Sequence, residues 1–155
     1  MSDDVQPEER IPYTPFRPVY EQTRHPMPAT VPAGLSLELS RARLLPGKEA
    51  EHDAWMQMLT DRYDECLDTL PAERAAFEAI FRHTEADGSV WMYHLSVVGT
   101  EGGGLDTSNP VDAEHEARAK QVKERGWEDL KPVFMLGPQH IVDAMAHWGR
   151  TGTVD

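Results

Sequence analysis

The chain has 155 residues, which fits one domain or one small domain with a tail. It contains 27 acidic and 15 basic residues, so its formal net charge is -12. This charge argues against a nucleic-acid partner or an anionic membrane surface, because both require clustered Lys and Arg. Hydrophobic residues make up 39% of the chain, which is enough for a folded core.

A single cysteine, Cys66, rules out an intrachain disulfide and favours a reducing, cytoplasmic location. The acidic N-terminus leads into no apolar stretch, so we expect no secretory signal. The best apolar run, 90–98, is too short for a membrane helix, which takes about 20 residues. No spacing in the sequence predicts a zinc site or a phosphate-binding loop, so we expect no cofactor on these grounds.

Residues 1–34 form a proline-rich arm that carries seven of the twelve prolines. Proline lacks a backbone donor, so this arm can form neither a regular helix nor a central strand. It nevertheless contains large apolar residues, namely Ile11, Tyr13, Phe16, Val19 and Tyr20. Two interpretations remain open: a disordered leader, or an extended arm that packs its aromatics on the domain or on a partner subunit.

The first regular elements follow the arm. Residues 35–45 alternate and predict a strand, and residues 48–70 predict one long helix with a continuous apolar stripe. Cys66 lies in that stripe, which favours a buried structural thiol over a nucleophile. Residues 75–84 and 89–98 then predict two strands joined by a hairpin at Asp87-Gly88.

The C-terminal part predicts a second helix, a last strand and a third helix. Asn109 is a good N-cap for a helix that begins at Pro110 and ends near Gly126. Residues 131–136 predict a strand, and residues 138–148 predict a short helix. The domain therefore spans residues 35–150, with a C-terminal tail at 151–155.

The order strand, helix, strand, strand, helix, strand predicts an α+β, ferredoxin-like fold. Such a fold has a four-stranded antiparallel sheet with both helices on one face. The other face is open, and an apolar face of that size needs a cover. We expect a second copy to cover it face to face, giving a homodimer in the form of a dimeric α/β barrel with an internal cavity.

Several short segments resemble a known family: 44–49 at the strand-to-helix junction, 77–81, 91–93, and 109–112 with His115 and Trp127. Through them, residues 41–135 resemble an uncharacterised bacterial family of the dimeric α/β-barrel superfamily. The resemblance implies the fold and a cavity. It implies no particular reaction, because that family has no established activity.

One candidate site follows from strand alternation. We expect Phe77, Ala79 and Phe81 to face the helices, and Arg41, Arg43, Glu78 and Arg82 to point into the barrel. A carboxylate beside arginine stays ionised and can accept a proton, so Glu78 is a candidate catalytic residue. The alternative is a structural ion pair at the barrel rim or the dimer interface.

His115 is a second candidate. Asp112 lies one helical turn earlier and could fix the tautomer of His115, which would then act as a general base or as a haem ligand. The alternative is a histidine that locks the helix to the sheet. We assign substrate contacts to Arg41, Arg43, Arg82, Trp91, Tyr93, His94 and Trp127.

Relatives of the dimeric α/β-barrel fold catalyse reactions with few polar residues, so the function expected from the fold is a small cofactor-independent enzyme of the isomerase, cyclase or monooxygenase type. Its substrate would be an apolar, polyketide-like small molecule held in the barrel. Two alternatives remain: a non-catalytic protein that binds a small molecule or a partner, and a haem-binding protein.

Overall fold

The computed structural model describes residues 25–155. The aromatic part of the proline-rich arm, from Ile11 to Tyr20, lies outside the described residues. Within the described part, residues 25–34 pack on the domain: Val31 is buried, and the sulfur of Met27 accepts a hydrogen bond from the Leu37 N–H.

The chain folds into an α+β domain with one four-stranded antiparallel sheet. Its elements are β1 (Leu35–Arg43), α1 (Glu49–Asp61), α2 (Tyr63–Glu73), β2 (Ala75–Thr84), β3 (Val90–Gly99), α3 (Pro110–Val122), β4 (Glu128–Leu130) and α4 (Gln139–Thr151). The strand order is β2-β3-β1-β4, with every neighbouring pair antiparallel. This order is consistent with the predicted ferredoxin-like fold.

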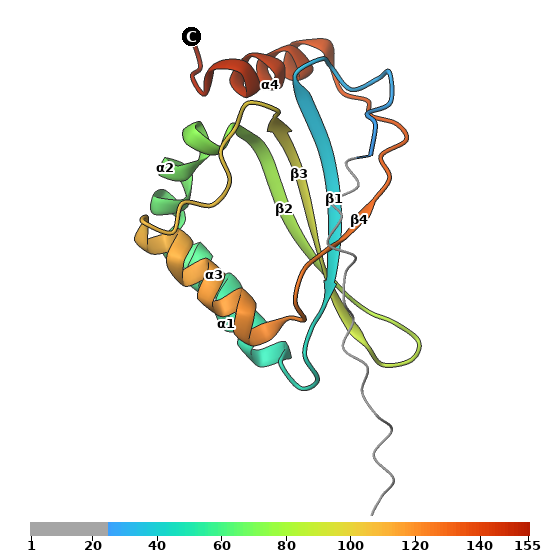
Figure 1. Cartoon of the computed structure of the whole chain (residues 1–155), viewed down its shortest axis with the longest axis vertical. Coiled ribbons are helices and arrows are strands. Elements are labelled where there is room, and N and C mark those ends of the chain that lie inside the picture. Colours follow the sequence, from blue (N-terminus) through green and yellow to red (C-terminus); the bar gives the residue numbers. More distant parts are fainter. Residues whose placement is uncertain (1–24) are drawn as a thin grey trace, which may run out of the picture.

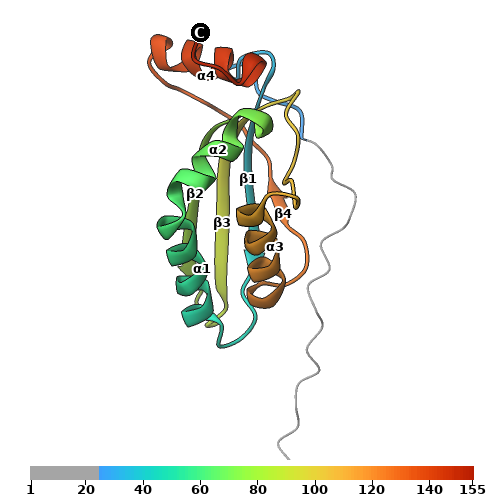
Figure 2. The ribbon, with the colours of Figure 1, turned by 90° about the vertical axis from the view of Figure 1, so that its left-hand side faces the viewer.

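The helices are distributed unequally around the sheet. In Figure 1, α1, α2 and α3 lie along one face, while α4 crosses one end of the sheet. Figure 2 looks onto the helix-covered face, where α1 and α2 lie beside β2 and α3 lies on the other side of β3. No helix within residues 25–155 is long and apolar enough to cross a membrane.

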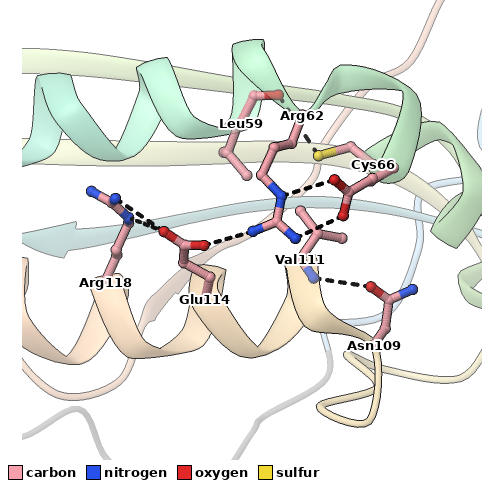
Figure 3. Close-up of polar contacts among 8 residues, drawn as sticks. Leu59, Arg62, Cys66, Asn109, Val111, Glu114 and Arg118 are labelled. Atoms are coloured by element: carbon pink, nitrogen blue, oxygen red, sulfur yellow. Dashed lines mark hydrogen bonds and ion pairs between the residues drawn. The ribbon is translucent and has the colours of Figure 1, made fainter.

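The predicted long helix is two helices that meet at Arg62, so the prediction of one helix over 48–70 is wrong in this detail. Arg62 has φ -108° and ψ 31°, outside the helical region. The hydrogen bonds Arg62 N–H to Met58 O and Cys66 N–H to Arg62 O persist, so the apolar stripe continues across the bend. The Arg62 guanidinium bridges Glu65 and Glu114, a tertiary contact that periodicity cannot reveal (Figure 3).

The second helix begins as predicted, because the Asn109 side chain accepts a hydrogen bond of 3.1 Å from the Val111 N–H. It ends at Val122, before the expected Gly126. The reason is that the next two residues pair with the end of β1, through a bridge between Leu44 and Lys123 and a hydrogen bond from the Glu124 N–H to Arg43 O.

The last strand was predicted at 131–136, and this position is wrong. The strand β4 covers only Glu128–Leu130, and residues 131–138 form an extended strap that leads to α4. Pro132 in the strap has no N–H to donate to a sheet. The final helix α4 includes Thr151, which therefore belongs to the domain and not to a tail.

Two hydrophobic cores hold the molecule together. The main core lies between the sheet and α1 and α3, and its buried members are Ala42, Leu44, Trp55, Met58, Met92, Val111 and Val122. The second core lies at the α4 end and contains Val31, Leu35, Val97 and Ala146. A close approach of Gly99 to Gly149 lets α4 contact the sheet, because a Cβ on Gly99 would overlap the carbonyl oxygen of Gly149.

The faces of β2 are the reverse of those predicted. Ile80 packs against the main core, Arg82 reaches residues of α1, and Glu78 approaches His94, so these three side chains face the helices. Phe77 and Phe81 point to the open face and are 50% and 57% exposed. Large side chains from α1 and β3 fill the space between the sheet and the helices. Phe77 and Phe81 therefore lie on the opposite, open face of the sheet.

Candidate functional site

The predicted site residues divide between the two faces of the sheet and do not line one cavity. The register places Arg41 opposite Tyr93 and Arg43 opposite Trp91, all on the open face. The other group lies on the helix-covered face and consists of Glu78, Arg82, His94, Asp112, His115 and Trp127. His83 pairs with Trp91 and so lies on the opposite face from His94.

On the open face, Arg41 is already paired. Its Nε lies 2.8 Å from Glu128 Oε2, and its Nη1 lies 3.2 Å from Glu85 Oε1. The guanidinium also stands 4.2 Å from the ring centre of Trp91, a cation–π contact. Arg41 therefore belongs to an ion-pair network. An anionic ligand could bind its guanidinium only by displacing the carboxylates of Glu85 and Glu128.

Arg82 joins the sheet to α1. Its Nη1 donates to Asp53 Oδ1 at 2.6 Å and lies 3.3 Å from His52 Nδ1. Because Arg82 donates to Nδ1, the neutral His52 ring carries its proton on Nε2. Burial, and then the charge of Arg82, lower the pKa of His52. These contacts give Arg82 a structural ion pair with α1 on the helix-covered face, whereas the sequence alternative placed such a pair at the barrel rim or the dimer interface.

The centre of the helix-covered face holds a carboxylate beside an imidazole. Glu78 on β2 and His94 on β3 are diagonal neighbours, and Glu78 Oε1 lies 3.7 Å from His94 Nε2. Both side chains are partly accessible, at 41% and 32%. The contact with His94 lowers the pKa of Glu78 against the opposing effect of burial, so Glu78 is ionised at neutral pH.

His115 on α3 is oriented by an indole. The Nε1–H of the fully buried Trp55 donates to His115 Nδ1 at 2.9 Å. An indole is only a donor, so Nδ1 is the acceptor and the neutral ring carries its proton on Nε2. Burial lowers the pKa of His115, which favours this neutral form.

Asp112 does not form the predicted hydrogen bond to His115. Its buried carboxylate accepts a hydrogen bond of 3.1 Å from the backbone N–H of Asp106. It thereby fixes the loop 100–108 to the start of α3. The expectation that Asp112 sets the tautomer is wrong, because Trp55 already occupies the Nδ1 side of the ring.

The indole ring of Trp127 lies beside the imidazole ring of His94. The centres of the two rings are 6.1 Å apart, and the Nζ of Lys123 lies 4.4 Å from the centre of the indole ring. Lys123 is buried and donates to the carbonyl oxygens of Glu124 and Gly126. Burial lowers the pKa of Lys123 to about 8.

Glu73, at the end of α2, is a member of this cluster that the sequence did not suggest. Burial, and then the charges of Glu78 and Asp112, raise its pKa to about 7. The loop after β3 packs against the C-terminal end of α2. The Gly103 N–H donates a hydrogen bond to Ala72 O, and Gly102 lies so close to the carbonyl oxygen of Glu73 that a Cβ at position 102 would overlap it. No local pattern marks such a contact between a loop and a helix end.

The helices above the cluster are tied together by the network in Figure 3. Arg62, at the bend between α1 and α2, contacts Glu114 on α3 at 2.6 Å, and Arg118 contacts the same carboxylate at 3.0 Å. Cys66 donates weakly to Leu59 O at 3.8 Å, and burial raises its pKa. This agrees with a structural thiol.

We refer below to Glu73, Glu78, His94 and His115 as the helix-face cluster. It places two carboxyl groups with opposite pKa shifts beside two imidazoles, an arrangement that can donate and accept protons. Within residues 25–155, no group of three or more His, Cys, Asp or Glu side chains is arranged to hold a metal ion.

Comparison with known proteins gives a family and no activity. No curated protein matches the chain, and no solved structure does. A family model matches residues 35–143, from the start of β1 into α4. The match covers well over half of the chain, so the protein belongs to this family, described as a family of unknown function (DUF6176).

Proposed function

We propose that the protein is a cofactor-independent enzyme that catalyses proton transfer, of the isomerase or cyclase type, on an apolar small molecule. The helix-face cluster is its reaction centre. The observation that carries the proposal is the pairing of Glu78 with His94 at 3.7 Å, both partly accessible, beside a histidine that Trp55 holds in one tautomer. Positioned carboxyl and imidazole groups are the usual means of acid–base catalysis.

The two carboxyl groups have complementary roles. Glu78 is ionised and accepts a proton from the substrate. Glu73, with a pKa of about 7, is partly protonated at neutral pH and returns a proton at another position. Neighbouring groups whose environments drive their pKa values apart are typical of an acid and a base in one site.

His115 serves as a hydrogen-bond donor. Its proton is on Nε2, so it can stabilise negative charge that develops on a substrate oxygen, and its lowered pKa keeps the ring neutral. The same tautomer does not fit haem ligation at this residue. A histidine that binds iron through Nε2 donates its Nδ1–H to a partner, whereas here Nδ1 accepts from Trp55.

The experiment is the exchange of α-protons in D₂O, followed by proton NMR, with 2-tetralone as an apolar ketone probe. Wild-type protein should accelerate the exchange, and Glu78→Gln should slow it by about 100-fold or more, because general acid–base groups contribute roughly that much. The rate should also fall as the pH rises through about 7, since Glu73 then loses its proton.

The matched control is Glu116→Gln, the same substitution on α3 at a residue that pairs with Lys120. This variant should exchange at the wild-type rate. Carboxyl NMR titrations of the wild type should show Glu73 titrating near pH 7 and Glu78 below its ordinary range. Equal rates for wild type and Glu78→Gln, or ordinary titration of both carboxyls, would exclude the proposed centre.

We also propose that two chains pack their open faces together as a dimeric α/β barrel. Phe77 and Phe81 leave about 200 Å² of apolar surface exposed, since a phenylalanine side chain carries about 200 Å². On the strap, which follows β4 at the other edge of the sheet, Val133, Phe134 and Leu136 are 74%, 62% and 84% exposed. Exposed apolar side chains of this size are typical of an interface.

Sedimentation at micromolar concentration tests the dimer. Wild-type protein should sediment as a dimer, and Phe81→Asp should convert it to a monomer. Leu67→Asp, at an exposed apolar residue of α2, should leave the dimer intact. A wild-type monomer would contradict this proposal without affecting the helix-face cluster, which lies on the other side of the sheet.

A further inference from the structure

We infer that the outer edge of β2 is a second contact surface, which pairs antiparallel with the β2 edge of another copy of the chain. In this contact Ile80 lies opposite the partner's Ile80. The inference concerns the edge of the sheet, so it goes beyond the proposed function and the open-face dimer, which concern its two faces.

The strand β2 is a long edge strand without the usual protection. Within residues 25–155 it pairs only with β3 and lies at one edge of the sheet (Figure 1). It has ten residues and holds neither lysine nor proline, which commonly block edge strands. The opposite edge differs, since β4 has only three residues and Pro132 follows it. Of the two edges, β2 is therefore the one that offers a long ladder to another strand.

The hydrogen bonds around the hairpin show which backbone groups of β2 point outward. The Glu85 N–H donates to Ser89 O at 2.8 Å, toward β3. On β3, Val90 O accepts from the Leu44 N–H at 2.8 Å and so points away from β2. Because the two directions alternate along an antiparallel ladder, the even-numbered residues of 78–84 direct their N–H and C=O groups to the outer edge.

The charged side chains at this edge are accessible and have room for a further partner. The side chains of Glu78 and Arg82 are 41% and 37% exposed, and they lie on either side of Ile80 on the same face. Glu78 contacts His94 only at 3.7 Å. The contacts of Arg82 within the described part of the chain use Nη1, which leaves the donors on Nε and Nη2 available.

The charges select one register and a second copy as the partner. Outward-facing residues pair with outward-facing residues, so the two strands can shift only in steps of two residues. With Ile80 at the centre, Glu78 of each copy lies opposite the partner's Arg82, and the twofold axis creates this pair twice. A shift of two residues separates both pairs, and a shift of four places like charges opposite each other.

Sedimentation of the whole protein tests this contact. The contact should be weak, because backbone groups that leave water gain little net free energy from each hydrogen bond. We therefore expect wild-type protein to gain mass above its micromolar state between about 10 µM and about 1 mM, the range in which weak contacts associate. If the open-face dimer does not form, the same contact appears as a monomer–dimer equilibrium, so the two proposals can fail separately.

Charge exchange makes the test specific. Glu78→Arg and Arg82→Glu each place like charges opposite each other and should weaken the association by about tenfold. The double variant restores both opposite-charge pairs and should associate about as well as wild type. Glu116→Arg, the same change of charge on α3, is the control and should leave the association unchanged. A double variant that associates no better than the single variants would overturn the inference.

Hydrogen exchange of the wild-type protein gives a second measurement that needs no variant. The N–H groups of Ile80 and Arg82 should exchange fast at about 10 µM and about tenfold more slowly at about 1 mM, because the partner strand then accepts from them. The N–H groups of Ala79 and Phe81, which face β3, should be slow at both concentrations. Fast exchange of Ile80 and Arg82 at both concentrations would exclude the edge contact, even if the open-face dimer forms.

Discussion

The two faces of the sheet are built on different principles. On the helix-covered face, Trp55 and Met58 of α1 pack with Met92 of β3 in the core between the sheet and the helices α1 and α3. Polar side chains lie among these apolar ones. The open face is covered by α4 at one end, and elsewhere it exposes Phe77 and Phe81 beside the paired Arg41. The comparison teaches that apolar residues on a strand do not by themselves identify the core face, because a face reserved for a partner is apolar as well.

The largest effect expected from this comparison comes from Trp55. Trp55→Ala removes a side chain that is 1% exposed and should lower the free energy of unfolding by about 3–5 kcal/mol, as for other large buried residues. It also frees Nδ1 of His115. Urea denaturation measures the effect. The control is Phe81→Ala on the open face, which should lower the free energy of unfolding of the monomer by less than about 1 kcal/mol. Similar losses for both variants would show that the two faces do not differ in packing.

The α4 end of the sheet should be less sensitive than the main core. Gly99→Ala forces a Cβ against the backbone of Gly149 and should cost about 2–3 kcal/mol, because α4 must move away. Gly104→Ala is the control, since a Cβ there meets no atom within 4 Å. Thermal denaturation compares the two, and a neutral Gly99→Ala variant would contradict the close contact between α4 and the sheet.

The smallest effect concerns Glu73 and depends on pH. Its folded pKa of about 7 lies above the ordinary value of 4.5, so its contribution to stability is fully present below about pH 4.5 and is lost as the pH rises through 7. Glu73→Gln removes this loss. The variant should be about 1–2 kcal/mol more stable than wild type at pH 8.5. The full difference between the folded and ordinary pKa values corresponds to about 3 kcal/mol, and solvent screening reduces the effect because Glu73 is partly exposed.

Melting curves at pH 4.5 and 8.5 check this last prediction. The advantage of Glu73→Gln over wild type should disappear at pH 4.5, where both side chains are uncharged. A constant difference between the two proteins across the pH range would mean that Glu73 has no raised pKa.

Much of the fold could be predicted from local patterns. The strand at 75–84, the hairpin at Asp87-Gly88 and the cap at Asn109 follow from alternation, turn residues and capping, all of which act over a few neighbouring residues. The bend at Arg62 and the early end of α3 were not predictable in this way. Both places make contacts with residues far away in the sequence, Arg62 with Glu114 and Glu124 with Arg43.

The candidate site was predicted only in part, and for a similar reason. Glu78, His94 and His115 were each identified by residue type and pattern. Their grouping depends on the register between β2 and β3, and the choice of face for β2 was wrong. The partners of His115 and Glu73 were missed because Trp55 is 60 residues from His115 in the chain, and the loop at Gly102 reaches Glu73 only in the folded domain.

The sequence by itself determined the α+β class, the order of most elements and the acidic character of the chain, because short-range periodicity and composition encode these properties. The tertiary structure decided which face of the sheet each side chain occupies, which tautomer His115 adopts and which carboxyl group keeps its proton. Those outcomes depend on burial and on contacts between distant residues, and they are fixed only when the helices pack on the sheet.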